Sequence, residues 1–264
     1  MPMAPVNGID LFYESHGNGP AVVFAHGVGG NHLIWWQQVP VLSKKYQCIT
    51  FDHRGFGLSY DSLDGPGGYA YVEDLKALLD HIGVEKTFLV GQSMGGIATL
   101  GFAVKYPERT LGLVLAGTTG AMGDKKIVDM LNDYTPPEDP AVRFSAPAFR
   151  ENHPVRTFLF LATSRINPPR NPRATTIFRT GEGPKADDVA SMNVPTLLIS
   201  GKHDVVMPTK IVEEVHKLIP ESRMEVLADC GHSTYFEHPE IFNRLISEFF
   251  SEVLLTDSVA SSQD

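Results

Sequence analysis

One short turn constrains this chain more than any other feature of its sequence. The segment 91–96, GQSMGG, joins an apolar run of buried-strand type, 86–90, to residues whose large apolar side chains recur at helical spacing. A strand must therefore turn into a helix within about two residues. Such a bend predicts a strained backbone at Ser93, with strand and helix too close together for side chains at Gly91 and Gly95.

The same turn makes Ser93 a candidate nucleophile. The bend pushes its hydroxyl above the edge of the sheet, and the helix that begins there directs free backbone N–H groups at whatever the hydroxyl attacks. A G-x-S-x-G pattern also arises by chance in a chain with 24 glycines among 264 residues. The strand before it and the helix after it are what favour the functional interpretation.

Composition describes one large globular domain and excludes several partners. The chain has 264 residues, of which 42% are hydrophobic, and 22 Lys and Arg against 31 Asp and Glu give a net charge of −9. This balance argues against nucleic acid or an anionic membrane as the main partner. No apolar stretch approaches the ~20 residues that span a bilayer, and the N-terminus lacks signal-peptide features.

The cysteines and histidines suggest neither a metal site nor a redox site. Cys48 and Cys230 are isolated, so we expect buried, reduced thiols in a cytoplasmic protein. The histidines do not have metal-ligand spacing, and we expect no metal and no cofactor. The sequence leaves monomer and homodimer open.

Strand-like and helix-like segments alternate along most of the chain. The alternation covers residues 1–119 and resumes over 193–255, which predicts a mostly parallel sheet flanked by helices. Between them, residues 120–192 form amphipathic pieces broken by prolines, which we interpret as a helical cap, or lid, over the sheet's C-terminal edge. The polar segment 256–264 predicts a disordered tail.

A serine hydroxyl needs a base, and the base needs an orienting group. In a parallel sheet these groups come from loops after other strands. His232 follows the last predicted strand, Asp204 follows the one before it, and the order Ser93, Asp204, His232 suits this kind of turn. Asp124 is an alternative acid after an earlier strand, although Thr118 and Thr119 occupy the end of that strand.

Five motifs then carry a resemblance to a known family. They are HGVGG at 26–30, DHRGFGLS at 52–59, GQSMGG at 91–96, GKHDVVMP at 201–208 and GHSTYFEHP at 231–239. Through them the chain resembles the α/β-hydrolase superfamily over nearly its whole length. It looks most like the branch containing 3-oxoadipate enol-lactonases, small bacterial carboxylesterases and cofactor-free haloperoxidases. The resemblance implies an eight-stranded sheet with a helical lid inserted after the sixth strand.

The resemblance also implies roles for individual residues. Ser93 would be the nucleophile, His232 the general base and acid, and Asp204 the carboxylate that orients it. The backbone N–H groups of Val28 and Met94 would form the oxyanion hole. A serine in this place excludes the aspartate-based mechanism of haloalkane dehalogenases and epoxide hydrolases. The expected activity is hydrolysis of a carboxylic ester or lactone through an acyl-enzyme. The alternatives are C–C hydrolysis of vinylogous diketones, perhydrolase or haloperoxidase activity, and a ligand receptor.

The substrate pocket is less constrained. Five arginines and no acidic residue lie between Asn152 and Gly181, which suggests that the lid holds a substrate carboxylate; a solvated or dimer-facing surface is the alternative. We expect His26 and His203 to fix loops, His53 to be structural, and Arg54 to pin its loop. The arginines are Arg156, Arg165, Arg170, Arg173 and Arg179, and the apolar pocket candidates are Trp35, Trp36, Phe158, Phe160 and Leu161.

Overall fold

A single eight-stranded sheet organises the structure, a computed structural model that describes residues 2–261, with side chains through residue 256. The strand order is β1-β2-β4-β3-β5-β6-β7-β8; β2 pairs antiparallel with β1 and β4, and all other pairs are parallel. The predicted eight-stranded, mostly parallel sheet is confirmed. The strands are β1 (Met3–Val6), β2 (Ile9–His16), β3 (Ala21–Ala25), β4 (Gln47–Phe51), β5 (Thr87–Gln92), β6 (Thr110–Ala116), β7 (Thr196–Gly201) and β8 (Arg223–Leu227).

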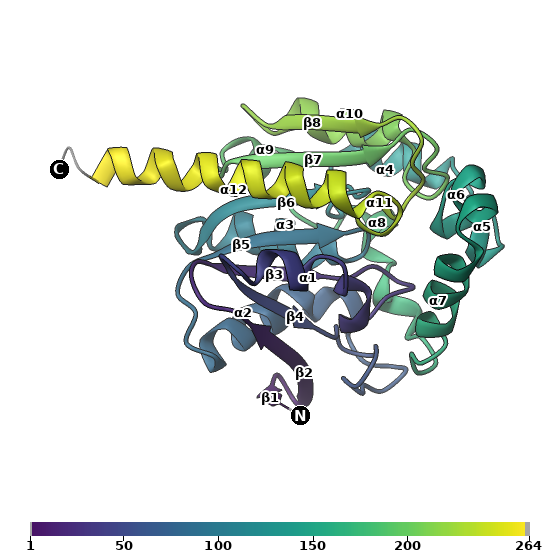
Figure 1. Cartoon of the computed structure of the whole chain (residues 1–264), viewed down its shortest axis with the longest axis horizontal. Helices are drawn as coiled ribbons and strands as arrows, with labels where there is room; N and C mark the ends of the chain where they lie inside the picture. Colours follow the sequence, from purple (N-terminus) through teal and green to yellow (C-terminus); the bar gives the residue numbers. More distant parts are fainter. Residues whose placement is uncertain (1, 262–264) are drawn as a thin grey trace.

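Helices cover both faces of the sheet (Figure 1). The alternation of side chains along each strand explains why: Val22 and Val23 of β3 are fully buried on opposite faces, in two separate hydrophobic clusters. One cluster includes residues of α2, α3 and α10, and the other residues of α1 and α12. The helices outside the 120–192 segment are η1 (His32–Trp35), α1 (Val39–Leu42), η2 (Gly67–Ala70), α2 (Tyr71–His81), α3 (Gly95–Lys105), η3 (Pro107–Arg109), α10 (Thr209–Leu218), α11 (Thr234–Glu237) and α12 (Pro239–Ser261).

The segment 120–192, called the insert below, is helical and follows β6, the sixth strand. Prolines start several of its helices instead of only breaking them, because proline suits the first helical turn. In Figure 1, α5, α6 and α7 lie beyond the C-terminal ends of the parallel strands. The division into a core and a cap at 120–192 stays a prediction. The helices are α4 (Lys125–Asn132), α5 (Pro140–Phe144), α6 (Pro147–Asn152), α7 (Pro154–Ser164), η4 (Pro172–Ala174), α8 (Ile177–Thr180) and α9 (Ala186–Ala190).

Two asparagine side chains fasten the insert to loops of the sheet. Asn167 accepts a hydrogen bond from the N–H of Gly57 (2.9 Å) and donates one to the carbonyl of Gly30 (3.2 Å). Asn171 donates to the carbonyl of Gly65 (3.0 Å). The insert is therefore bonded to the same loops that surround the candidate site.

The C-terminal segment differs from the expectation of a disordered tail over 256–264. Helix α12 continues to Ser261, and its end projects past the sheet (Figure 1); residues 262–264 lie outside the described residues. The sequence after Val253 contains neither glycine nor proline, so nothing in it stops the backbone hydrogen bonding of the preceding turns.

The described residues include no helix suited to a membrane and two free, buried cysteines. None of their helices combines the length and the apolar character needed to cross a bilayer. Cys48 and Cys230 are free and buried, and burial raises the pKa of the Cys48 thiol to about 12. Such a thiol stays protonated and unreactive, as expected of a structural cysteine.

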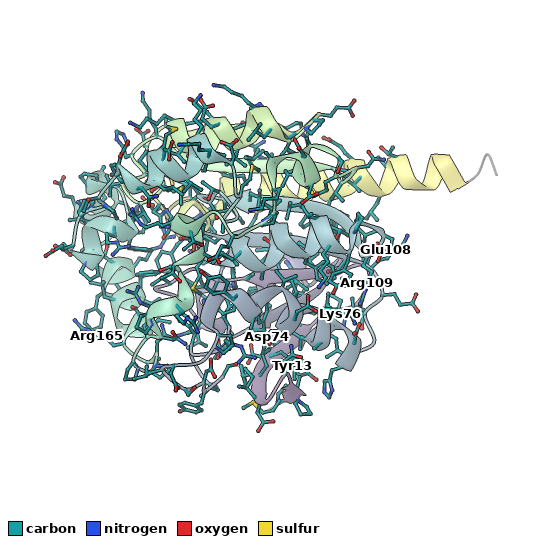
Figure 2. All side chains as sticks on the ribbon, turned by 180° about the vertical axis from the view of Figure 1, so that it is seen from behind. Tyr13, Asp74, Lys76, Glu108, Arg109 and Arg165 are labelled. Carbon is teal, nitrogen blue, oxygen red and sulfur yellow. The ribbon has the colours of Figure 1, made fainter. Side chains whose placement is uncertain are left out.

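A buried ion pair fixes the loop after β4, as predicted for Arg54. Its guanidinium donates to both carboxylate oxygens of Asp74 on α2, over 2.6 and 2.8 Å, and to the carbonyl of Asn7. Both charged side chains are almost fully buried, and hydrogen bonding to Asp74 raises the pKa of Arg54. Asp74 lies on the side of the molecule seen in Figure 2.

Replacing Asp74 by asparagine should therefore destabilise the fold strongly. The variant Asp74→Asn leaves the charge of Arg54 buried without its main partner, and we expect the free energy of unfolding in urea to fall by about 3 kcal/mol. Glu73→Gln is the matched control, because Glu73 lies on the same helix and forms an exposed pair with Lys105 (2.6 Å). That change should cost less than about 1 kcal/mol. Equal losses would contradict the prediction.

Candidate active site

The turn after β5 has the strained geometry that the sequence predicts. Ser93 has φ +50°, in the left-handed region that residues with a side chain rarely adopt. A Cβ atom on Gly91 would lie 2.1 Å from Oγ1 of Thr99, and one on Gly95 would lie 2.1 Å from the carbonyl oxygen of Ala25. Only glycine fits at these two positions, so the prediction of a tight bend is confirmed.

Hydrogen bonds hold Ser93 in this conformation. Its N–H donates to the carbonyl of Ala116 at the end of β6 (2.9 Å). Its own carbonyl accepts from the hydroxyl of Thr118 (2.6 Å). Thr118, two residues after the end of β6, thus braces the bend and supplies no acid.

The structure brings His232 and Asp204 together. His232 Nδ1 lies 2.8 Å from Asp204 Oδ2, and the other carboxylate oxygen accepts from the N–H groups of Val206 and Met207, both at 2.8 Å. The carboxylate is buried and the imidazole almost so. Because a carboxylate accepts the Nδ1 proton, Nε2 of the neutral ring is left free to accept a proton.

The alternative acid Asp124 and the loop residue His203 have other positions. Asp124 begins α4 as its N-cap, and its carboxylate accepts from the N–H of Ile127 (3.0 Å). Asp124 is therefore occupied as a helix cap. His203 is exposed, does not line the cavity, and contributes its backbone N–H to the carbonyl of Cys230 (2.8 Å). It fixes the loop that carries Asp204.

Ser93 and His232 line one cavity of about 350 Å³ beneath the insert. Its wall combines the glycine-rich loop after β3, the turn after β5 and the loop after β8 with residues of the insert. A cavity of this size suits a small molecule. The lining residues are Val28, Gly29, Gly30, Gln92, Ser93, Leu131, Tyr134, Pro136, Pro140, Arg143, Phe144, Phe160, Ser164, Arg170, Thr175, Phe178, Arg179, Val206, Met207, His232, Ser233 and Tyr235.

Two backbone N–H groups next to this cavity have the properties predicted for an oxyanion hole. Val28 lies in the glycine-rich loop, and Met94 is the N-cap of α3. Within residues 2–261, neither N–H donates a hydrogen bond to another protein group. Free amides at the start of a helix and in a glycine loop attract negative charge. Their use in catalysis stays a prediction.

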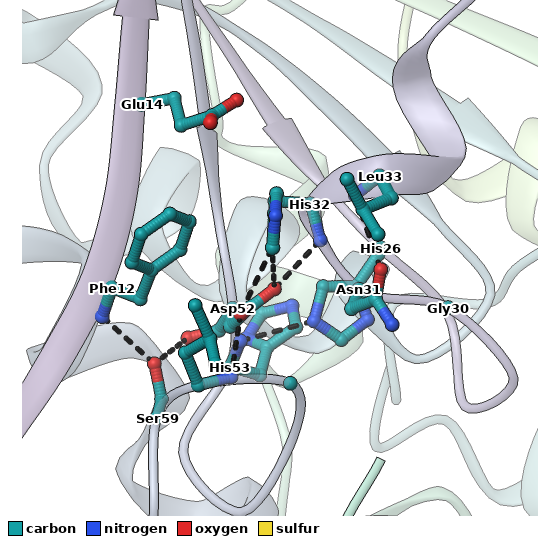
Figure 3. Close-up of polar contacts among 12 residues, drawn as sticks. Phe12, Glu14, His26, Gly30, Asn31, His32, Leu33, Asp52, His53 and Ser59 are labelled. Atoms are coloured by element: carbon teal, nitrogen blue, oxygen red, sulfur yellow. Dashed lines mark hydrogen bonds and ion pairs between the residues drawn. The ribbon is translucent and has the colours of Figure 1, made fainter. Parts of the chain in front are cut away.

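A buried polar network holds the glycine-rich loop (Figure 3). His26 Nδ1 donates to the carbonyl of Gly27 (2.8 Å), and its Nε2 accepts from the N–H of His53 (3.0 Å). His32 donates both its N–H and its Nδ1 proton to Asp52, over 2.6 and 2.9 Å. Burial lowers the pKa of His26 to about 4, so the ring is neutral at pH 7. His26 does not line the cavity and fixes a loop instead, as expected.

Glu237 is a supporting residue that the sequence analysis missed. Its buried carboxylate accepts from the N–H groups of Gly231 (3.0 Å) and Ser233 (3.2 Å), on either side of His232, and from that of Ala146 in the insert (2.8 Å). Burial raises its pKa, while these three hydrogen bonds act in the opposite direction. A glutamate directly after two aromatic residues, five positions after His232, was the available signal.

Helix α7 supplies one of the predicted pocket residues. Phe160 lines the cavity and stacks on Phe144 with ring centroids 3.5 Å apart. Phe158 is 65% exposed, because residues two apart in a helix face nearly opposite directions. Leu161 packs against the core cluster and does not line the cavity. The predictions for Phe158 and Leu161 are therefore wrong.

The two tryptophans also lie outside the cavity lining, contrary to prediction. Trp35 is fully buried, with its ring against Phe24 and Tyr235 at centroid distances of 5.1 and 4.6 Å. Trp36 is 47% exposed and contacts Phe236. Trp35 fills the core between α11 and β3, so the cavity is reached by Tyr235, not by either tryptophan.

The site thus combines a braced serine and an oriented imidazole in one cavity, with free backbone amides on Val28, which lines it, and on Met94, next to Ser93. Across the side chains that the structure describes, no three His, Cys, Asp or Glu residues are grouped so as to hold a metal ion.

Comparison with known proteins identifies the family of the chain. A family model described as the alpha/beta hydrolase fold matches residues 20–143 and 146–239. The chain belongs to the α/β-hydrolase family. The resemblance inferred from the five motifs is confirmed, including the branch that contains esterases and haloperoxidases.

The proteins to which this hydrolase is similar are named for different activities. A Bacillus subtilis protein, provisionally named 2-succinyl-6-hydroxy-2,4-cyclohexadiene-1-carboxylate synthase, is 30% identical and covers 88% of this chain and 91% of its own. A Mycobacterium tuberculosis protein, provisionally named non-heme bromoperoxidase BpoC, is 28% identical and covers 93% of this chain and 99% of its own. The structure of a thermophilic esterase from Thermogutta terrifontis has a TM-score of 0.81 and 28% identity, with 96% and 98% coverage.

The backbone strain at Ser93 should lower the free energy of unfolding by a measurable amount. Ser93→Gly relieves a left-handed conformation that costs a residue with a side chain about 1–2 kcal/mol. We expect the free energy of unfolding to rise by about 1 kcal/mol in urea titration. Ser251→Gly, in the exposed part of α12, is the control and should lower it by about 0.5 kcal/mol. Similar losses at the two sites would contradict the prediction.

The buried histidines should make the hydrolase sensitive to acid. Burial also lowers the pKa of His53, so the folded state resists protonation while the unfolded state accepts it. Stability is then complete above the unfolded pKa near 6.5 and falls as the pH decreases. With its pKa of about 4, His26 alone should account for about 3 kcal/mol between pH 6.5 and 4.

The variant His53→Phe tests this sensitivity. Among the described residues neither ring nitrogen of His53 has a hydrogen-bond partner, and the ring packs against Phe51, Tyr71 and His26. We expect the variant to gain about 1 kcal/mol at pH 7, because an unpaired buried polar group is removed. Urea unfolding from pH 7 to 4 should also show a smaller loss than in the wild type. A parallel pH profile would refute the role of His53.

Proposed function

We propose that this α/β-hydrolase is a serine hydrolase that cleaves a carboxylic ester or lactone of a small molecule. One observation carries the proposal: Ser93, held in a strained bend, lines the same cavity as His232, whose Nδ1 lies 2.8 Å from the carboxylate of Asp204. A hydroxyl at its normal pKa is a poor nucleophile, and this combination supplies the base and its orienting group.

The acylation step follows from these positions. Ser93 Oγ attacks the carbonyl carbon while His232 Nε2 takes the hydroxyl proton. The carbonyl oxygen becomes an oxyanion that accepts hydrogen bonds from the N–H groups of Val28 and Met94. When the C–O bond of the ester breaks, His232 returns the proton to the leaving alkoxide. In a lactone the alcohol remains attached to the acyl group.

Deacylation repeats the sequence with water. Nε2 of His232 removes a proton from water, whose oxygen attacks the acyl carbon, and the proton then passes to Ser93 Oγ as the acid leaves. Asp204 stabilises the imidazolium through its contact with Nδ1. The two N–H bonds from Val206 and Met207 to its other oxygen keep this carboxylate in place.

The alternatives use the same residues on other substrates. C–C hydrolysis of a vinylogous diketone and perhydrolysis, in which hydrogen peroxide replaces water, both need the serine and the histidine. Apolar residues such as Leu131, Phe178 and Met207 line much of the cavity and favour an acyl chain. The similarity to the Thermogutta terrifontis esterase also supports an ester. A ligand receptor would need no strained serine.

Loss of the hydroxyl should abolish the reaction. A panel of 4-nitrophenyl esters of graded acyl length, assayed beside lactones, should identify a substrate whose kcat falls at least about a thousandfold in Ser93→Ala and in His232→Ala. Ser164→Ala is the control, because Ser164 lines the same cavity and has no proposed chemical role. It should retain activity within a few fold.

Covalent labelling separates the alternatives. A fluorophosphonate probe should modify wild-type protein at Ser93 and leave folded Ser93→Ala unmodified. Absence of labelling in folded wild type would instead favour a receptor. Cleavage of a diketone with no turnover of any ester or lactone would assign the C–C reaction.

A further inference from the structure

The cavity of the candidate site has a single sign of charge. Its charged lining residues, His232 aside, are Arg143, Arg170 and Arg179, and no aspartate or glutamate is among the lining residues of the described chain. The whole protein carries a net charge of −9, so this concentration of arginine runs against its composition. All three arginines belong to the insert.

Most arginines of the insert have structural partners. Arg179 donates to the carbonyls of Leu131 (2.6 Å) and Tyr134 (3.1 Å) and so joins α8 to the end of α4. Arg156 donates to the side chain of Gln37 (2.8 Å).

Two further arginines lie outside the cavity lining. Arg173 lies over the ring of Tyr69, 6.0 Å from its centroid. Arg165 does not line the cavity, and Figure 2 shows its side chain at the outer edge of the molecule. Of the five arginines singled out in the sequence, only Arg170 and Arg179 reach the cavity.

Arg143 and Arg170 differ from the other arginines of the insert because they line the cavity and their guanidinium groups have no protein partner among the described residues. Arg143 is half-buried on α5, and Arg170 is exposed and lies two residues before the start of η4. Within residues 2–256, neither guanidinium forms a hydrogen bond or an ion pair. Burial lowers the pKa of Arg143, and the positive charge of Arg170 lowers it further, so the two like charges interact. Such a pair is stabilised by an anion placed between its members.

We propose that Arg143 and Arg170 form a carboxylate-binding site, and that the substrate is an ester or lactone with a free carboxylate distant from its scissile carbonyl. Arginine forks match a carboxylate with two parallel N–H bonds, which fixes orientation as well as affinity. The core would carry the reactive groups and the insert would hold the far end of the substrate. The reaction rests on the proposed function, whereas the anion site does not.

Matched substrates test the site through activity. Mono-4-nitrophenyl adipate and 4-nitrophenyl hexanoate have the same acyl length and differ in the terminal carboxylate. We expect Arg143→Gln and Arg170→Gln each to lower kcat/KM for the adipate ester about ten- to a hundredfold, the range for a hydrogen bond to a charged group. Activity on the hexanoate ester should change less than about twofold. Arg165→Gln, an arginine variant outside the cavity, should change neither.

Salt provides a second readout of the same pair. Raising the ionic strength from 0.02 to 0.5 M should reduce the wild-type preference for the adipate ester and leave the hexanoate rate nearly constant, because screening weakens only the charged contact. Equal responses of the two esters to salt or to the arginine variants would overturn the proposal.

Binding to Ser93→Ala protein separates this proposal from the proposed function. Calorimetry should detect hexanoate but not its neutral analogue hexanamide, and Arg143→Gln in the same background should abolish the signal. Arginine-dependent hexanoate binding without any esterase activity would keep the anion site and remove the proposed reaction. Ester hydrolysis with no arginine-dependent binding would do the reverse. Inorganic phosphate binding as tightly as hexanoate would refute the assignment to carboxylates.

Discussion

The candidate site depends on one strained residue at the point where β5, β3 and α3 meet. At φ +50°, Ser93 holds a backbone conformation that costs free energy, and it persists because its neighbours leave no alternative. Gly91 and Gly95 allow α3 to pack against the sheet without Cβ atoms, and Thr118 bonds to the Ser93 carbonyl. The cost of this conformation is offset by the buried sheet around it, and its result is a serine that lines the cavity.

Three buried carboxylates position the loops around that hydroxyl in the same physical way. Asp204, Asp52 and Glu237 each accept hydrogen bonds from two or more backbone N–H groups of the loops at the C-terminal edge of the sheet. A buried carboxylate that loses such partners pays its full desolvation penalty. The loops therefore have little freedom to separate from these carboxylates. His232 lies between Gly231 and Ser233, whose N–H groups both donate to Glu237, and its imidazole contacts Asp204.

The sequence predicted the parts of the site that follow from local backbone rules. Gly91 and Gly95 predict the bend at Ser93, because only glycine fits at those positions. The placement of Ser93, Asp204 and His232 after three different strands follows from a parallel sheet, in which the ends of the strands share one edge. It failed where the direction of a side chain decides the outcome. Trp35 and Phe160 are both large apolar residues near the site, yet only tertiary packing determines that Trp35 fills the core and Phe160 lines the cavity.

The arginines of the insert also show what sequence alone cannot predict, namely which side chains reach the cavity. Composition alone indicated a basic segment, but it could not separate Arg179, whose donors are used by backbone carbonyls, from Arg170, whose donors are free. It also left out Arg143, which precedes the arginine-rich stretch and reaches the cavity because the short helix α5 turns it inward. Because the insert is built of short helices started by prolines, each one can direct a side chain into the cavity independently of the sheet. Changes in the insert can thus alter what the cavity binds while the bend, the imidazole and their carboxylates stay the same.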